Sequence, residues 1–104
     1  MAIYKNITSA TTVDLINKNA GSGNINCINI SNYGAQQATI LLFVEDATAA
    51  ETTNPGNNKF YYLTTIMPGV TNLKLNENIS FNSSIYNLRI SVVGLTPRIS
   101  VIIT

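Results

Sequence analysis

Hydrophobic and polar residues alternate along most of this chain. In residues 24–32 isoleucine alternates with asparagine, and in residues 85–93 Tyr86, Leu88, Ile90 and Val92 alternate with polar side chains. Such a period of two is typical of a β-strand with one buried face, and no window carries an apolar stripe at helical spacing that is long enough for a convincing helix. The pattern therefore predicts an all-β protein.

The alternation divides the chain into short strands. They are predicted at residues 2–8, 13–17, 24–32, 38–46, 59–67, 71–76, 85–93 and 98–104, and turn-forming sequences such as "NAGSG", "NPG" and "MPGV" lie between them. About eight short strands joined by such turns predict an antiparallel β-sandwich, either jelly-roll or immunoglobulin-like. A chain of 104 residues has the size of one domain, so we expect a single β-sandwich domain over residues 1–104.

Some hydrophobic residues fall on the side of a strand opposite to the predicted core. Residues 38–46 are apolar on both parities, which is typical of a central strand or of one whose outer face is covered. In residues 59–67, if Phe60 and Tyr62 fill the core, Tyr61 must stand on the outer face. In the last strand Ile102 lies opposite to the core residues Ile99, Val101 and Ile103. The candidate interface residues are therefore Tyr61, Leu41, Phe43 and Ile102.

Composition narrows the possible partners. The chain is 45% hydrophobic but only 11% charged, with a formal net charge of +1, whereas an ordinary soluble domain is about 25% charged. Without a basic stripe we expect no nucleic-acid binding. No run approaches the roughly 20 apolar residues of a membrane span, and "MAIYKNITS" lacks the pattern of a signal peptide, so we expect no membrane association. Cys27, the single cysteine, is predicted to be a small buried residue.

The sequence offers little for catalysis. It has no histidine and one cysteine, so a zinc site lacks ligands and the commonest general base is missing. Asp46 and Glu51 could form a carboxylate pair, but solvated charges beside a loop are the favoured interpretation. Calcium binding by residues 46–51 or 54–58 is disfavoured because the spacing of a dedicated loop is missing. We expect no enzyme, no cofactor and no metal.

The frequent asparagines pose a separate question, because asparagine is a poor strand former. One interpretation is that these outer faces lie against other subunits, where a buried unpaired charge would cost several kcal/mol but an amide can be satisfied by hydrogen bonds. The alternative is A+T-rich coding, which enriches asparagine and isoleucine but leaves the scarcity of lysine unexplained.

The order of blocks adds a resemblance. "AIYKNITSATTVDLI", "SGNINCINISNYGAQQATILLFVED", "KFYYLTTIMPGVTNLKL" and "ISFNSSIYNLRISVVGLTPRISVIIT" together resemble small β-sandwich virion proteins of tailed bacteriophages, particularly those of marine cyanobacteria. The resemblance covers nearly the whole chain but is one of style and block order, without a catalytic signature. It implies a non-enzymatic structural protein of the virion, made in the host cytoplasm.

Two functions follow as predictions. The first is capsid decoration and stabilisation, or a neck or tail component, with other virion proteins (major capsid, neck or tail subunits) as partners and with assembly as a homo-oligomer. The alternative is a glycan-binding module for host-surface adhesion, with Tyr61 and the amide-rich residues 54–58 contacting the sugar.

Overall fold

A computed structural model describes residues 2–19, 24–46, 59–76 and 78–104 of the chain. In this part of the chain the structure is all-β and antiparallel, with no helix. Its strands are β1 (Ile3–Ile7), β2 (Thr11–Ile16), β3 (Asn24–Ile25), β4 (Ile28–Asn32), β5 (Ala38–Asp46), β6 (Lys59–Met67), β7 (Thr71–Leu75), β8 (Ile79–Ser80), β9 (Tyr86–Val93) and β10 (Ile99–Ile103).

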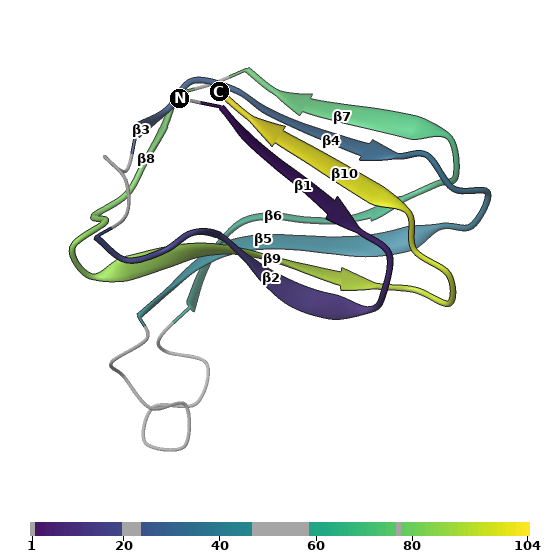
Figure 1. Ribbon diagram of the computed structural model, residues 1–104, viewed down its shortest axis with the longest axis horizontal. Helices are drawn as coiled ribbons and strands as arrows, with labels where there is room; N and C mark the ends of the chain where they lie inside the picture. The colour runs from purple at the N-terminus through teal and green to yellow at the C-terminus, as the bar shows by residue number, and fades with distance from the viewer. Residues whose placement is uncertain (1, 20–23, 47–58, 77) are drawn as a thin grey trace.

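The strands form two four-stranded sheets that pack face to face (Figure 1). One sheet has the order β1-β10-β4-β7 and the other β2-β9-β5-β6, while β3 and β8 form a separate two-stranded ribbon. The chain crosses between the large sheets repeatedly, and this strand order is that of the jelly roll. The β-sandwich prediction is therefore confirmed, and of its two variants the jelly-roll is the correct one.

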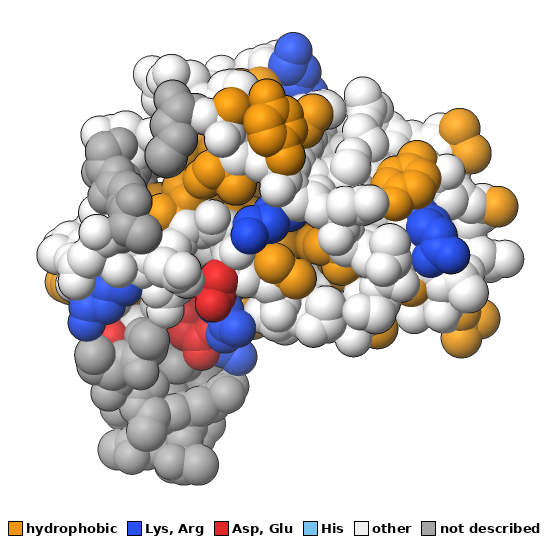
Figure 2. Space-filling model, in the orientation of Figure 1, with side chains coloured by type: hydrophobic (Ala, Val, Ile, Leu, Met, Phe, Trp, Pro, Cys, Tyr) orange, Lys and Arg blue, Asp and Glu red, His pale blue; other side chains and the backbone are white. Residues whose placement is uncertain are grey.

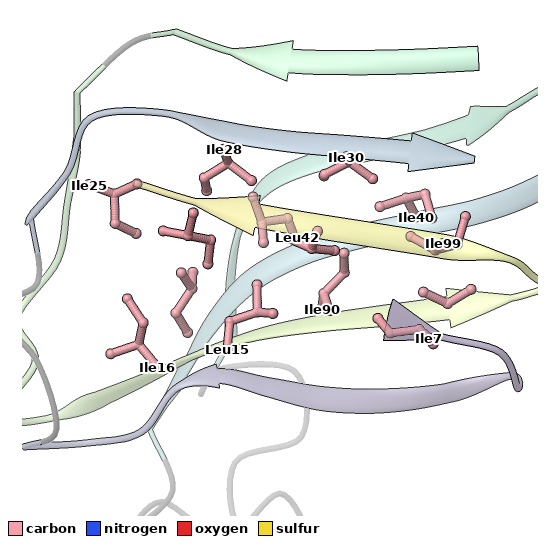
Figure 3. Packing of buried hydrophobic residues seen from close by; sticks show 14 of the residues in the cluster. Ile7, Leu15, Ile16, Ile25, Ile28, Ile30, Ile40, Leu42, Ile90 and Ile99 are labelled. Atoms are coloured by element: carbon pink, nitrogen blue, oxygen red, sulfur yellow. The ribbon is translucent and has the colours of Figure 1, made fainter. Parts of the chain in front are cut away.

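Period-two alternation explains the core. Each strand turns one parity inward, and the inward residues of both sheets interdigitate between them (Figure 3). The most completely buried side chains are aliphatic: Ile28, Ile30, Ile40, Leu42, Leu88, Ile90 and Ile99. β-branched isoleucine fits a pleated surface well, so the same residues favour the strand and fill the space between the sheets.

The predicted strand at residues 24–32 divides in two. Ile25 and Ile28 are both buried although they have opposite parity, and Asn26 and Cys27 form the break between β3 and β4. The backbone N–H groups of Asn26 and Cys27 donate to the carbonyl of Thr104, at 3.0 and 3.3 Å. This break leaves Cys27 half-buried, with its Sγ 3.7 Å from Asn76 Oδ1, so the expectation of a buried cysteine was wrong.

Candidate functional site

The clearest candidate site lies where the β4–β5, β6–β7 and β9–β10 turns meet at one end of the sandwich (Figure 1). We call this the loop end and define it as residues 33–37, 68–70 and 93–96. Its turns surround an open depression of about 640 Å³. The residues that line the depression all lack charge: Ala35, Gln36, Gln37, Ala38, Thr39, Pro68, Gly69, Val93, Gly94 and Leu95.

Large apolar side chains project from the loop end. Leu95 is 92% exposed and Val70 is 79% exposed, while Tyr33 and Val93 are also exposed. Ile66 at the end of β6 extends the same surface. Figure 2 shows hydrophobic side chains at this end of the molecule, on a surface that is otherwise mostly neither hydrophobic nor charged. Grouped exposure of this kind is typical of an interaction site, whereas scattered single residues would need no explanation.

A buried asparagine holds the turns of the loop end together. Asn32 is only 1% exposed and is the buried polar side chain of the described core. Its Nδ2 donates to the backbone carbonyls of Gln36 at 2.9 Å and of Met67 and Pro68 at 3.1 Å each, and its Oδ1 accepts from the N–H of Gly34 at 3.2 Å. Because these partners belong to the β4–β5 and β6–β7 turns, one side chain fixes both.

Backbone contacts between the same two turns reinforce this arrangement. The N–H of Val70 donates to the carbonyl of Gly34 at 3.0 Å. A Cβ placed on Gly69 would lie 2.5 Å from the carbonyl oxygen of Ala35, so no larger residue fits there without a shift of backbone. Val70 itself has a φ of 55°, which is a strained conformation for a β-branched residue. Hydrogen bonds and close packing thus join the two turns, and the backbone strain lies at Val70, whose apolar side chain is exposed.

The four candidate interface residues do not form one surface. Leu41, Phe43 and Tyr61 point away from the core on the sheet β2-β9-β5-β6, because Leu42 and Val44 occupy the inward parity of β5. Ile102 points outward from the opposite sheet, beside Tyr4 and Asn29. Ile102 and Leu41 are half-buried.

Phe43 is already covered by its own chain. Its ring centroid lies 5.2 Å from that of Tyr61, and the ammonium of Lys59 lies 5.8 Å above the ring. Phe43 is therefore buried while Tyr61 is 51% exposed. Of this pair, Tyr61 presents the surface that a partner could contact.

The other aromatic residues of β6 are also exposed. Tyr61 does face outward, but the condition from which its position was argued, that Phe60 and Tyr62 fill the core, does not hold, because both are exposed. The register of β6 against β5 shifts at this point, with Leu42 opposite Leu63 and Phe43 opposite Tyr61, which makes Tyr62 an extra, bulged residue. The Tyr62 hydroxyl donates to the carbonyl of Ser80 at 3.1 Å, and burial raises the pKa of this tyrosine.

An ion-paired arginine lies beside Phe43 on the same outer face. Arg89 Nε is 2.6 Å from Asp14 Oδ1, and its Nη1 donates to Glu45 Oε1 at 2.7 Å. The hydrogen bond to Glu45 raises the pKa of Arg89, and the charge of Asp14 acts in the same direction against the effect of burial. Arg89, Asp14 and Glu45 are thus paired with one another on this face.

The asparagine-rich alternation forms the outer face of the other sheet. Asn6, Ser100, Ser31 and Asn72 stand opposite one another across four strands in register. Their polar groups bond locally, since Ser31 Oγ donates to Asn72 Oδ1 and the Tyr33 hydroxyl donates to Asn6 Oδ1. The face is polar with few charges, as the sequence predicted.

The described residues offer neither a metal site nor a membrane-spanning helix. Within residues 2–19, 24–46, 59–76 and 78–104, no group of histidine, cysteine, aspartate and glutamate side chains could hold a metal ion. The same ranges contain no helix of the length and hydrophobicity that a membrane span requires. Glu51 and residues 54–58, which entered the carboxylate, calcium and glycan predictions, lie outside the described residues.

Comparison with known proteins identifies the fold alone. No protein-family model and no curated protein matches the sequence. Among solved structures, the chain is similar to PirA, at 8% identity and a TM-score of 0.55, over 97% of this chain and 90% of that one. It is similar to the PBSX exported protein XepA at 10% identity and a TM-score of 0.54, over 99% of this chain but 36% of XepA. A chain of the cyanophage Pam1 capsid asymmetric unit matches at 15% identity and a TM-score of 0.46, over 99% and 81% of the two chains.

Proposed function

We propose that this protein is a non-enzymatic structural component of a tailed-bacteriophage particle, which binds neighbouring subunits through the loop end. The observation that carries the proposal is Leu95, an apolar side chain that is 92% exposed while it lines a neutral depression. Val70, which is 79% exposed, follows Gly69 of the same depression along the chain. Charged residues are depleted at the centre of protein interfaces, and apolar residues are enriched there. The jelly roll is a fold of viral capsid domains, which is consistent with the resemblance in sequence style.

The strain at Val70 supports the same proposal. A β-branched residue at positive φ costs free energy in the isolated protein, and its exposed side chain gains nothing from the core. Strained residues held by a rigid frame cluster at functional positions. Contact with a neighbouring subunit would bury Val70 and offset that cost.

The test is whether the protein occurs in particles and whether the loop end places it there. Particles purified from cells that produce this chain should contain it at a fixed copy number by quantitative mass spectrometry. In competition with the parent chain, Leu95→Lys should be incorporated at least tenfold less. Asn17→Lys, at an exposed position after β2, is the matched control and should be incorporated like the parent. Absence from particles, or equal incorporation of Leu95→Lys, would refute the proposal.

A glycan-binding module is the second candidate, since jelly rolls also serve as lectin domains. The observation that favours it is the half-exposed ring of Tyr61, held in place by Phe43, which is suited to stacking on a sugar. A glycan array distinguishes the two candidates. Binding by the parent that disappears in Tyr61→Ala, together with no incorporation into particles, would favour adhesion over structural assembly.

A further inference from the structure

The four edge strands of the two sheets differ in how they are protected against pairing with another strand. The edges are β1 and β7 in one sheet and β2 and β6 in the other. An unprotected edge is a template for another strand, and natural proteins block it with charges, bulges or short length. Lys5 lies in the middle of β1, Lys74 lies within β7, and β2 carries Asp14 next to an irregular register.

The fourth edge, β6, lacks this protection over most of its length. It is nine residues long, and its one charged residue is Lys59 at its first position, so residues 60–67 are uncharged. The bulge at Tyr62 interrupts the strand near its start, but Leu63 to Met67 pair with β5 in regular register. Among the described residues, the backbone of residues 63–66 has hydrogen-bond partners on β5 alone. No described residue therefore pairs with the other side of this segment.

We infer that residues 63–67 of β6 pair antiparallel with the same segment of a second copy of the chain, which joins two β2-β9-β5-β6 sheets into one continuous sheet. In a two-fold symmetric pair of strands, each residue near the axis faces itself or a close neighbour. A charge at the centre of the strand would then face a like charge, which is destabilising. Of the four edges, β6 is the one with five consecutive paired residues, 63–67, that carry no charge.

The side chains near the axis fit self-pairing. Thr65 lies at the centre of the segment and would face Thr65 of the second copy, and threonine pairs across antiparallel strands are favourable. Ile66 is exposed on the outer face, and Leu41 lies half-buried beside Thr64 on β5. In this register Ile66 of one copy would face Thr64 of the other, so pairing would cover part of the exposed Ile66 side chain and shield it from water. The inference concerns the purified protein and holds whether or not the chain belongs to a particle.

The experiment is sedimentation velocity of the purified protein over a range of concentrations. The parent should form a dimer. Thr64→Lys, which places a charge on the outer face of β6, should raise the dimer dissociation constant at least tenfold. Asn72→Lys, at an exposed position of the opposite edge strand β7, is the matched control and should dimerise like the parent. Thermal unfolding of each variant, measured at one low concentration where all are monomeric, checks that the fold is retained.

Two results would overturn the inference. One is a parent that stays monomeric up to about 1 mM, which corresponds to an association free energy weaker than about 4 kcal/mol. The other is a dimer whose dissociation constant is unchanged in Thr64→Lys. A dimer that is abolished by Asn72→Lys or Leu95→Lys, and not by Thr64→Lys, is the same result. Because the assay uses no particles, its failure is separate from failure of the proposed function. A Leu95→Lys protein that still dimerises but is not incorporated into particles would support both the β6 dimer and the proposed function of the loop end.

Discussion

Asn32 on β4 donates a hydrogen bond to the backbone carbonyl of Met67 at the end of β6, over 3.1 Å, and so joins the two sheets of the sandwich through a buried side chain. The same amide reaches Gln36 and Pro68. Replacing Asn32 with alanine would leave these carbonyls without a partner in a buried place. We expect a loss of about 2–3 kcal/mol in the free energy of unfolding, measured by urea denaturation.

Asn29→Ala is the matched control, because Asn29 lies on the outer face of the same strand. It should change stability by less than about 0.5 kcal/mol. Equal losses in the free energy of unfolding of Asn32→Ala and Asn29→Ala would show that the hydrogen bonds of Asn32 to the carbonyls do not stabilise the fold.

The sequence predicted the regular strands well, and it failed where the alternation breaks. Strands β5 and β6 have the predicted bounds, because long period-two runs leave few alternatives. The break at Asn26 and Cys27 could have been found, since Ile25 and Ile28 have opposite parity and one unbroken strand cannot bury both. The short strand β8 (Ile79–Ser80) was missed because two residues carry no periodic signal.

The candidate site was less accessible from sequence. The loop end is assembled from three turns that are distant along the chain, and these turns come together only because the strands cross between the two sheets. Asn32 follows Ile28 and Ile30 on the inward parity, so its burial was implied by the pattern, but asparagine at the end of a strand is usually part of a turn. The edge position of β6, which explains the exposure of Phe60 and Tyr62, depends on topology.

Gly69 should tolerate no side chain. A Cβ there would lie 2.5 Å from the oxygen and 2.6 Å from the carbon of the Ala35 carbonyl, and backbone on both sides cannot move without breaking the turn contacts. We expect Gly69→Ala to lower the free energy of unfolding by about 2 kcal/mol. Gly94→Ala is the control, because its Cβ would meet the nearest atom, the Gln37 carbonyl oxygen, at 3.3 Å. A smaller loss for Gly69→Ala than for Gly94→Ala would contradict the close packing of Gly69 against Ala35.

Tyr62 should titrate at higher pH in the folded protein than in the unfolded chain. Burial raises its pKa, so the folded state holds the phenol proton more tightly. The contribution of Tyr62 to stability is therefore full below the unfolded pKa of about 10 and is lost as the pH rises through the folded pKa. NMR of tyrosine rings labelled with carbon-13, with the Tyr62 signal assigned by its absence in Tyr62→Phe, measures the midpoint. A Tyr62 titration midpoint in the native protein at or below the midpoint in urea would show that burial does not raise the pKa of Tyr62.

Val70→Gly should separate stability from assembly. Glycine adopts a φ of 55° without steric conflict, whereas valine does not, and the exposed valine side chain contributes little to the core. We expect the variant to be more stable than the parent by about 0.5–1 kcal/mol in urea denaturation.

If the loop end binds neighbouring subunits, the same Val70→Gly variant should be incorporated into particles less than the parent, because it lacks an apolar contact. Val93→Thr, at an exposed position of the same end with ordinary backbone, is the control: it should reduce incorporation without any gain in stability. A Val70→Gly protein that is no more stable than the parent would remove the argument from strain, and one that is more stable and fully incorporated would remove Val70 from the interface.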